Sequence, residues 1–532
     1  MIALRSRLNT LVIGFALCAA QSALAQTQPA SPVLVWGDQV TANLDPHIGQ
    51  TGVPDQFVVI NVYDTLYRYQ GPEGKLVPWL ATGYKVSEDR LSWTFTLRPG
   101  VKFHDGSEIT ADDVVYSFHR ALAMNGPVIG PFRKVLKAEG VRAIDPLTVS
   151  FTLNEVYAPF FSTVPAIAIV NRRQIEANVK DGDRGTGWLS QNSAGSGAYI
   201  IRPGSFESYK VFQMTRNPNH FMGWSHNARP IETVRAQGFP ETSTQVNALL
   251  KGEVSAGNSY LNPTQMDRLG RSRDIGFQEA ESMRVYVIRM HNQRPPFDNI
   301  NTRRCFSWAF NYEGFISAIL KNVGVRNPGP LPKNMWGYPS DLVGYRYDMA
   351  KAKEACDRAR AEGANLDREI EIHTIPHNSQ TTDAAQMLQS DMKKLGVNIK
   401  IVPRNGSQLF ASAGKIDTTP DLWTHWVSAY FLDPENWVGQ MYSTRYQGSW
   451  TAGSWYQNAK VESLLQTART ELDQAKRTPM YEQAIRQIVD DAADIWVYNT
   501  VQKRPINARL RGIDFTPVGA GSEIRTMYFA EK

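Results

Sequence analysis

The chemistry open to this sequence is limited first by the motifs that it lacks. It contains no G-x-S-x-G nucleophile motif, no phosphate-binding glycine loop, no H-E-x-x-H and no paired-cysteine metal site. Its 9 histidines are scattered, and none belongs to a set with metal-ligand spacing. The run His104-Asp105-Gly106 has acid and base residue types, but it lies between a predicted strand and a predicted helix, where a turn accounts for it. We therefore expect no enzyme, no metal and no cofactor, with an exported hydrolase as the alternative of a different class.

A short aromatic segment indicates binding chemistry instead. Trp423, His425, Trp426 and Tyr430 lie close together in the sequence. Aromatic rings stack on flat groups and attract cations, so these four residues are candidate ligand contacts. The same residue types also fill ordinary cores, and core packing is the alternative for each of them.

The elements that must position this segment alternate irregularly between helix and strand. This mixture predicts α/β layers, and 532 residues predict two or three domains. Within residues 461–491, which have a helical pattern, Pro479 is expected near the start of a second helix and not in the middle of one helix. The patterns predict strands at 33–36, 92–97, 285–290, 369–375 and 398–403, and helices at 111–124, 243–251, 302–320, 349–362, 384–395 and 461–491.

The N-terminus predicts export. Arg5 and Arg7 precede a short apolar run at 8–20, and Ala23-Leu24-Ala25 supplies a cleavage site, as in a secretory signal peptide that is too short to span a bilayer. Removal of residues 1–25 lowers the formal net charge from +6 to +4. The basic residues are dispersed, which argues against a nucleic-acid partner.

Two cysteines remain after this processing. Cys305 and Cys356 could form a disulfide in an oxidising compartment, or both could be buried free thiols.

Several segments, taken in order, resemble one known family. They are Tyr63–Tyr69, Leu76–Ala81, Trp93–Arg98, Gly100–Ser107, Thr110–Ser117, Gly195–Tyr199, Arg216–Asn219, Pro295–Asn299 and Arg303–Asn311. Their order and spacing resemble the periplasmic dipeptide/oligopeptide-binding family, the peptide/nickel-binding type of extracellular solute-binding protein that serves ABC importers. The resemblance covers essentially the whole chain after the signal peptide.

This resemblance implies a fold and a function. The fold is α/β with two lobes, an added subdomain on the larger lobe and a ligand cleft between the lobes, which close over the ligand. The implied domains are a signal peptide at 1–25, lobe I at 26–285 with an inserted subdomain at about 66–190, lobe II at 286–500, and a return to lobe I at 501–532. The implied function is capture of a peptide or peptide-like solute in the periplasm and its delivery to a membrane ABC permease, by a monomer.

One departure from the family affects the ligand. The segment Asp421–Pro434 resembles the family's cleft-lining W-x-A-D-Y-x-D-P motif, whose first aspartate pairs with the α-ammonium group of a peptide; counted back from Asp433-Pro434, that position is Tyr430. A tyrosine carries no charge at neutral pH. The ligand either lacks a free α-amine there or finds another carboxylate, such as Asp433. Oligosaccharides or other ring-bearing solutes, and metal chelates such as nickel complexes, are the alternative ligands.

Further candidate contacts follow from positions in the family or from their chemistry. Ser196 and Gly197 could present backbone N–H groups, and Arg404 could bind a carboxylate through its planar fork. The candidates implied by position are Tyr286, Met290 and Asn292 on a segment that crosses between the lobes, Tyr260 at the cleft floor, and His47 beside Asp45-Pro46.

Overall fold

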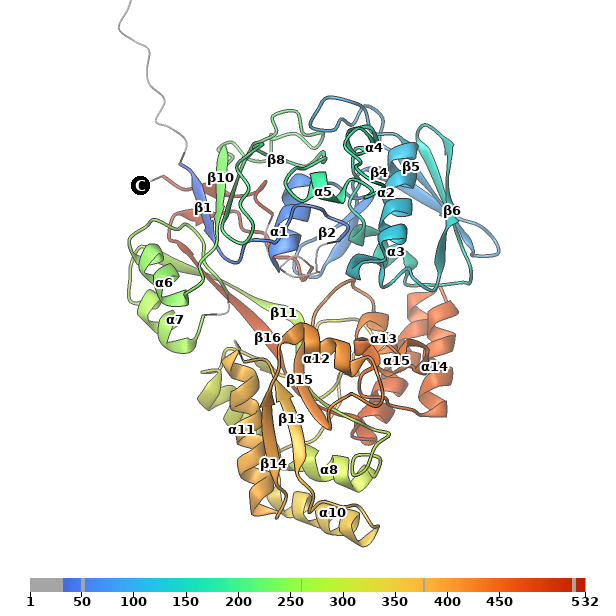
Figure 1. Ribbon diagram of the computed structural model, residues 1–532, viewed down its shortest axis with the longest axis vertical. Coiled ribbons are helices and arrows are strands. Elements are labelled where there is room, and N and C mark those ends of the chain that lie inside the picture. The colour runs from blue at the N-terminus through green and yellow to red at the C-terminus, as the bar shows by residue number, and fades with distance from the viewer. Residues whose placement is uncertain (1–31, 49–52, 260, 377, 519–522, 532) are drawn as a thin grey trace, which may run out of the picture.

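Two lobes are connected by two long strands that cross between them (Figure 1). The computed structural model describes residues 32–48, 53–259, 261–376, 378–518 and 523–531. The crossing strands are β11 (Ile275–Met290) and β16 (Asp494–Asn507), which pair antiparallel along most of their length. This arrangement confirms the predicted α/β two-lobed fold.

Lobe I contains two four-stranded sheets. The first has the order β1-β10-β9-β8, in which β1 and β10 are parallel and the other pairs antiparallel. The second is antiparallel, has the order β4-β5-β7-β6, and belongs to the subdomain at the upper right of Figure 1. The strands are β1 (Leu34–Gly37), β4 (Ala81–Val86), β5 (Ser92–Leu97), β6 (Leu136–Asp145), β7 (Thr148–Leu153), β8 (Tyr199–Ile201), β9 (Val211–Arg216) and β10 (Thr233–Gln237).

Lobe I also contains helices and a hairpin. Helix α1 (Val53–Val62) packs on the first sheet, with the Phe57 ring 5.1 Å from the Trp36 ring. Helix α2 (Ala111–Met124) has the predicted bounds, and the backbone N–H of Thr110 donates to the Asp113 carboxylate at 2.9 Å, which caps its first turn. The hairpin β2 (Tyr67–Gln70) and β3 (Lys75–Pro78) leads from α1 into the subdomain.

Lobe II is built on one sheet of order β12-β16-β11-β15-β13-β14. Two groups of helices cover the two faces of this sheet. The core residues Tyr286, Ile288 and Met290 of β11 pack against the first group, whereas the alternate residues Val285 and Val287 pack against the second group on the opposite face. The remaining strands are β12 (Val325–Arg326), β13 (Ile370–Thr374), β14 (Ile399–Pro403) and β15 (Leu422–Val427). The first group is α8 (Ile300–Ala309), α10 (Met349–Ala361) and α11 (Ser379–Lys394), and the second is α13 (Gly439–Tyr442), α14 (Ala459–Thr470) and α15 (Gln474–Asp490).

The crossing strands change register where the lobes join. The β11–β16 ladder shifts between Glu281 and Val285 and again between Tyr286 and Val287. Towards lobe I, Ala256 bridges Ile506 of β16, and it also bridges Trp36 of β1. Strand β16 is thus part of the lobe II sheet at one end and is bridged to lobe I at the other.

The two cysteines form a disulfide. Cys305 and Cys356 are bonded with their Cα atoms 5.1 Å apart, and both are fully buried between α8 and α10. No helix in the described part of the chain is long and apolar enough to cross a membrane. The predicted signal peptide lies outside the described residues.

Candidate functional site

The lobe II sheet ends in an edge that faces lobe I. Strands β13 and β15 are parallel, as are β13 and β14. The carboxyl ends of these three strands, at Thr374, Pro403 and Val427, therefore lie on the same edge of the sheet. In open α/β sheets, ligands bind beyond the carboxyl ends of the strands. The segment that follows β15 touches lobe I directly, because the backbone N–H of Leu432 donates to the Tyr69 hydroxyl at 3.0 Å.

Trp426 lies at this edge, next to the crossing strands. Its Nε1 donates to the Tyr498 hydroxyl at 3.3 Å, and its ring centroid is 4.9 Å from that of Tyr286. The Arg284 guanidinium lies 4.8 Å from the Trp426 ring centroid, a cation–π distance. Trp426 keeps 8% of its surface exposed, whereas Tyr286 is fully buried.

Trp423 and His425 point to the opposite face of the sheet from Trp426, because they alternate with it along β15. Their rings stack at 4.5 Å and are packed beside Phe410 and Trp450. Both ring nitrogens of His425 are buried without a hydrogen-bond partner, and burial followed by the charges of Arg289 and Arg284 holds its pKa well below the usual value. His425 is therefore a neutral imidazole in an aromatic cluster.

Tyr430 is half-buried on the segment beyond β15. Its backbone N–H donates to Asn436 Oδ1 at 3.3 Å, and Asn436 Nδ2 donates to the Ser428 carbonyl at 2.9 Å. Its ring centroid lies 6.5 Å from that of Trp450, edge to face. The asparagine therefore fixes the backbone that presents the Tyr430 ring.

The two acids that follow Tyr430 are engaged in buried ion pairs. Arg477 donates to both oxygens of Asp433, at 2.7 and 2.8 Å. Arg469 Nε donates to Glu435 at 3.0 Å, and the Tyr446 hydroxyl donates to the same oxygen at 2.8 Å. Asp433 thus has a bidentate arginine partner, which leaves it poorly suited to replace the family's aspartate.

On lobe I, three predicted contacts are buried. The Ser196 hydroxyl donates to Asp64 at 2.7 Å, and the Gly197 N–H donates to the Val62 carbonyl at 3.0 Å. His47 is fully buried; Ala168 O lies 2.9 Å from its Nε2, and Arg120 Nη1 lies 3.0 Å from its Nδ1. Burial and the Arg120 charge lower the pKa of His47 to about 4, so Nδ1 accepts from Arg120 and Nε2–H donates to Ala168.

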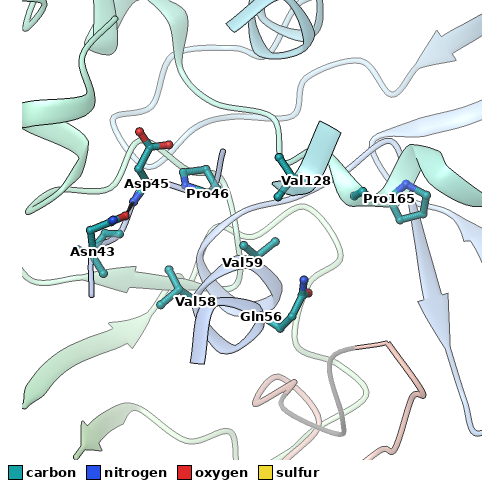
Figure 2. A pocket seen from close by; sticks show the side chains of 10 residues that line it. Asn43, Asp45, Pro46, Gln56, Val58, Val59, Val128 and Pro165 are labelled. Atoms are coloured by element: carbon teal, nitrogen blue, oxygen red, sulfur yellow. Dashed lines mark hydrogen bonds between the residues drawn. The ribbon is translucent and has the colours of Figure 1, made fainter. Parts of the chain in front are cut away.

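A pocket in lobe I lies between the loop that carries Asp45 and helix α1 (Figure 2). It is lined by the apolar side chains of Pro46, Val58, Val59 and Val128 and by the polar side chains of Asn43, Asp45 and Gln56. Arg120 pairs with both oxygens of Asp45, at 2.8 and 2.5 Å. Asp45 is thus neutralised by Arg120.

The remaining predicted residues are dispersed. Met290 is fully buried at the far end of β11, and Asn292 Nδ2 donates to the carbonyls of Met290, Ser454 and Ala493. Arg404 is exposed just beyond β14. Tyr260 lies outside the described residues.

Sequence reasoning missed several residues of this region. Arg284, Tyr498, Trp450 and Phe410 surround the residues of β15. Arg284 directly precedes the strand predicted at 285–290, and only the true start of β11 at Ile275 would have included it. No group of three histidine, cysteine, aspartate or glutamate side chains in the described chain could hold a metal ion.

The fold and this edge define a two-lobed receptor for a small solute. The chain belongs to the bacterial extracellular solute-binding proteins of family 5, whose model for the middle region matches residues 75–449. This family consists of non-catalytic solute receptors of ABC importers, so the chain is such a receptor and not an enzyme.

Individual relatives are distant but cover most of the chain. The "Probable D,D-dipeptide-binding periplasmic protein DdpA" of Escherichia coli is 29% identical and covers 82% of each chain. "Heme-binding protein A" of Haemophilus influenzae is 26% identical over 86% of this chain and 85% of its own. The structure of the periplasmic binding protein DppA of Helicobacter pylori in complex with the peptide STSA is similar in fold, with a TM-score of 0.80, 22% identity, and coverage of 94% of this chain and 98% of its own.

Proposed function

We propose that this chain captures a peptide or peptide-like solute between its lobes in the periplasm and delivers it to an ABC permease. Two of the relatives above are described with a dipeptide or a peptide, and both are named as periplasmic proteins. The observation that carries the proposal is the position of residues 428–433. They follow the carboxyl end of β15 and touch lobe I through the Leu432–Tyr69 hydrogen bond.

Trp426 and Tyr430 of lobe II and Arg284 of the crossing strand β11 are the proposed solute contacts. They keep some exposure beside the crossing strands and combine two aromatic rings with one cation. Trp423, His425, Tyr286 and Met290 support these residues from inside the lobe, since each is at most 1% exposed.

The solute is proposed to lack a free α-ammonium group at Tyr430. Tyr430 is uncharged at neutral pH, and the acids that follow it, Asp433 and Glu435, are held by Arg477 and Arg469. An ammonium group placed there would lose water without gaining an opposite charge.

The test is isothermal titration calorimetry of the protein from Gln26 onward with paired ligands. Each di- or tripeptide is compared with its N-acetylated form, so that the two differ only at the α-amine. Tighter binding of the acetylated member supports the proposal. Tighter binding of the free peptides overturns the part about the α-amine, and silence from all peptides overturns the peptide class.

A second candidate is a ring-bearing solute such as an oligosaccharide. The edge-to-face pair of Tyr430 and Trp450 at the lobe boundary favours it, since sugar and heterocyclic rings stack on aromatic faces. Oligosaccharides and heme in the same titration series decide between the two, and heme is included because one relative is named for binding it.

The export, lobe boundaries and oligomeric state belong to the same proposal. Residues 1–25 are removed on export, lobe I comprises 26–285 and 501–532, and lobe II comprises 286–500. The segment after β16 supports this division, because Asn227 of lobe I donates to the Met527 carbonyl at 2.9 Å. The protein acts as a monomer. Intact mass of the exported chain and light scattering in solution test these points.

A further inference from the structure

The lobes also meet away from the crossing strands. One edge of the subdomain contacts lobe II beside α14: the Ala158 N–H donates to the Arg469 carbonyl at 2.8 Å, and Glu155 pairs with Arg445. Tyr157 is 1% exposed, and its pKa is raised well above the usual value by burial and by neighbours that include Tyr446 and Glu435 of lobe II. This contact surface is thus partly buried and polar.

Tyr69 contacts the segment of lobe II that carries Tyr430, at a point two positions after Tyr430 in the sequence. Its hydroxyl donates to the Ser162 carbonyl at 2.5 Å within the subdomain and accepts from the Leu432 N–H at 3.0 Å across the lobes. Tyr69 is 6% exposed and Leu432 is 8% exposed. The hydrogen bond that the Tyr69 hydroxyl donates to Ser162 orients this hydroxyl, so that a lone pair of its oxygen points to the Leu432 N–H and accepts from it.

The shapes of the two surfaces also match at this point. Gly74, in the turn between β2 and β3, lies so close to Leu432 that a Cβ atom at Gly74 would be 1.8 Å from Leu432 Cδ1. Gly74 has a φ of +65°, which glycine adopts without strain. The Leu432 side chain therefore fits under a turn that has no side chain of its own.

Leu432 is mechanically linked to the rest of its segment. Tyr430 lies two positions before it and Asp433 one position after it, and these are fixed to lobe II by Asn436 and Arg477. A force that holds Leu432 against Tyr69 therefore also sets the distance between Tyr430 and lobe I.

We propose that Tyr69 is a positioning residue that latches the solute-contact segment of lobe II against lobe I, through its hydroxyl and the Leu432 N–H. The latch rests on the proposed function for its purpose, which is to favour closure over the solute. In an open arrangement Leu432 N–H bonds to water, so the hydroxyl of Tyr69 stabilises only the arrangement with the lobes in contact.

The test needs no solute. Spin labels at Ile144→Cys in the subdomain and Val343→Cys in lobe II, both highly exposed at 64% and 71%, report the distance between the lobes by double electron–electron resonance. Tyr69→Phe removes only the hydroxyl and leaves a buried N–H unpaired in the closed arrangement. We expect the ratio of closed to open molecules to fall by about five- to tenfold.

Tyr199→Phe is the matched control. The Tyr199 hydroxyl is also fully buried and donates to a carbonyl, Ile231 O at 2.9 Å, but both residues lie in lobe I. The Tyr199→Phe variant should have a lower unfolding temperature but the same distances between the spin labels in the two lobes. Leu432→Ala, which keeps the N–H but removes the side chain under Gly74, should reduce the closed fraction as well.

If Tyr69→Phe leaves the distance distribution of the wild type and lowers only the unfolding temperature, as Tyr199→Phe does, the latch is overturned. Because these distances are measured without solute, they do not depend on whether any peptide binds.

Discussion

At the scale of single residues, the proposed function makes Tyr430 the position that limits which end groups the solute can have. A carboxylate at this position would gain a charge-assisted hydrogen bond to an ammonium group, which contributes about 1.5–3 kcal/mol. Tyr430→Asp should therefore bind free di- and tripeptides at least about tenfold more tightly than the wild type, with no gain for their N-acetylated forms. Isothermal titration calorimetry measures both, with Tyr430→Phe as the variant that keeps the ring and the neutral charge.

An equal gain for free and acetylated peptides would show that the new carboxylate acts elsewhere than on the α-amine. No gain for either would mean that Tyr430 does not lie against the amino end of the solute.

His47 makes the stability of lobe I depend on pH. Its pKa is about 4 in the folded protein, lowered by burial and then by Arg120, against about 6.5 when unfolded. Between these two values the unfolded chain binds more protons, so the free energy of unfolding falls as the pH drops from about 6.5 to about 4, by roughly 3 kcal/mol in total. His47→Gln can still accept from Arg120 and donate to Ala168, but it does not titrate.

Urea unfolding from neutral pH to about pH 4 measures this slope. The difference between wild type and His47→Gln removes the contributions of acids common to both. We expect the variant to lose less stability on acidification; parallel curves would show that His47 is not held neutral.

Part of this site could be read from the sequence, and part could not. Trp426 and Tyr430 stand out because they belong to the aromatic segment before Asp433-Pro434, and Tyr430 also because it replaces the aspartate of the family motif that this segment resembles. The partner of Leu432 does not stand out, because Tyr69 is 363 positions away and a tyrosine in a strand has no local signal for a contact across lobes. Arg284 was missed because its polar neighbours on β11 do not show the apolar pattern that predicts a strand.

At the scale of elements, the disulfide connects α8 to α10 across 51 positions of chain. Closing a loop of that length reduces the entropy of the unfolded chain, and the chain-entropy model gives about 4 kcal/mol. Replacing both cysteines, as Cys305→Ala with Cys356→Ala, should lower the free energy of unfolding of lobe II by about that amount. Denaturant unfolding of the variant, compared with the wild type with and without reductant, measures it.

Reduction of the wild type should reproduce most of this loss. An unchanged midpoint in both experiments would show that the bond does not form in the protein.

Elements with strong local signals were predicted well. Helix α2 was correct at both ends because its cap and its apolar stripe agree. The single helix predicted at 302–320 was wrong: Phe310 is extended, and the Asn311 side chain accepts from the Gly314 N–H at 2.8 Å, which starts a new turn. The strand predicted at 285–290 was too short, since β11 begins at Ile275 and its polar first half is held by pairing with β16, which local pattern does not show.

At the scale of the whole molecule, the order of the elements predicted α/β layers but not how the lobes meet. The subdomain and α14 are joined by pairs such as Ala158 and Arg469, which are remote in the sequence. In the sequence, neither residue of such a pair differs from an ordinary surface residue, because only the fold brings the two together. The family resemblance supplied the two-lobed arrangement, and the structure supplied the contacts.

These contacts should differ in strength according to their exposure. The Glu155–Arg445 ion pair across the lobes is only half-buried, with side-chain exposures of 40% and 23%. Such pairs contribute little, and salt screens them. Glu155→Gln should lower the closed-to-open ratio by about two- to threefold at low ionic strength and have no effect in about 0.5 M sodium chloride, whereas the effect of Tyr69→Phe should persist at both.

The matched control is Glu176→Gln, which breaks a similarly exposed pair with Arg172 inside lobe I and should leave the distance between the lobes unchanged at either salt concentration. A Glu155→Gln effect that survives high salt, or exceeds that of Tyr69→Phe, would place the main hold between the lobes at α14. Closure would then be controlled from the outer edge of the subdomain and not beside the solute. A salt-insensitive effect confined to Tyr69 would instead mean that closure is held where the solute binds, so that the solute and the latch stabilise the same arrangement of the lobes.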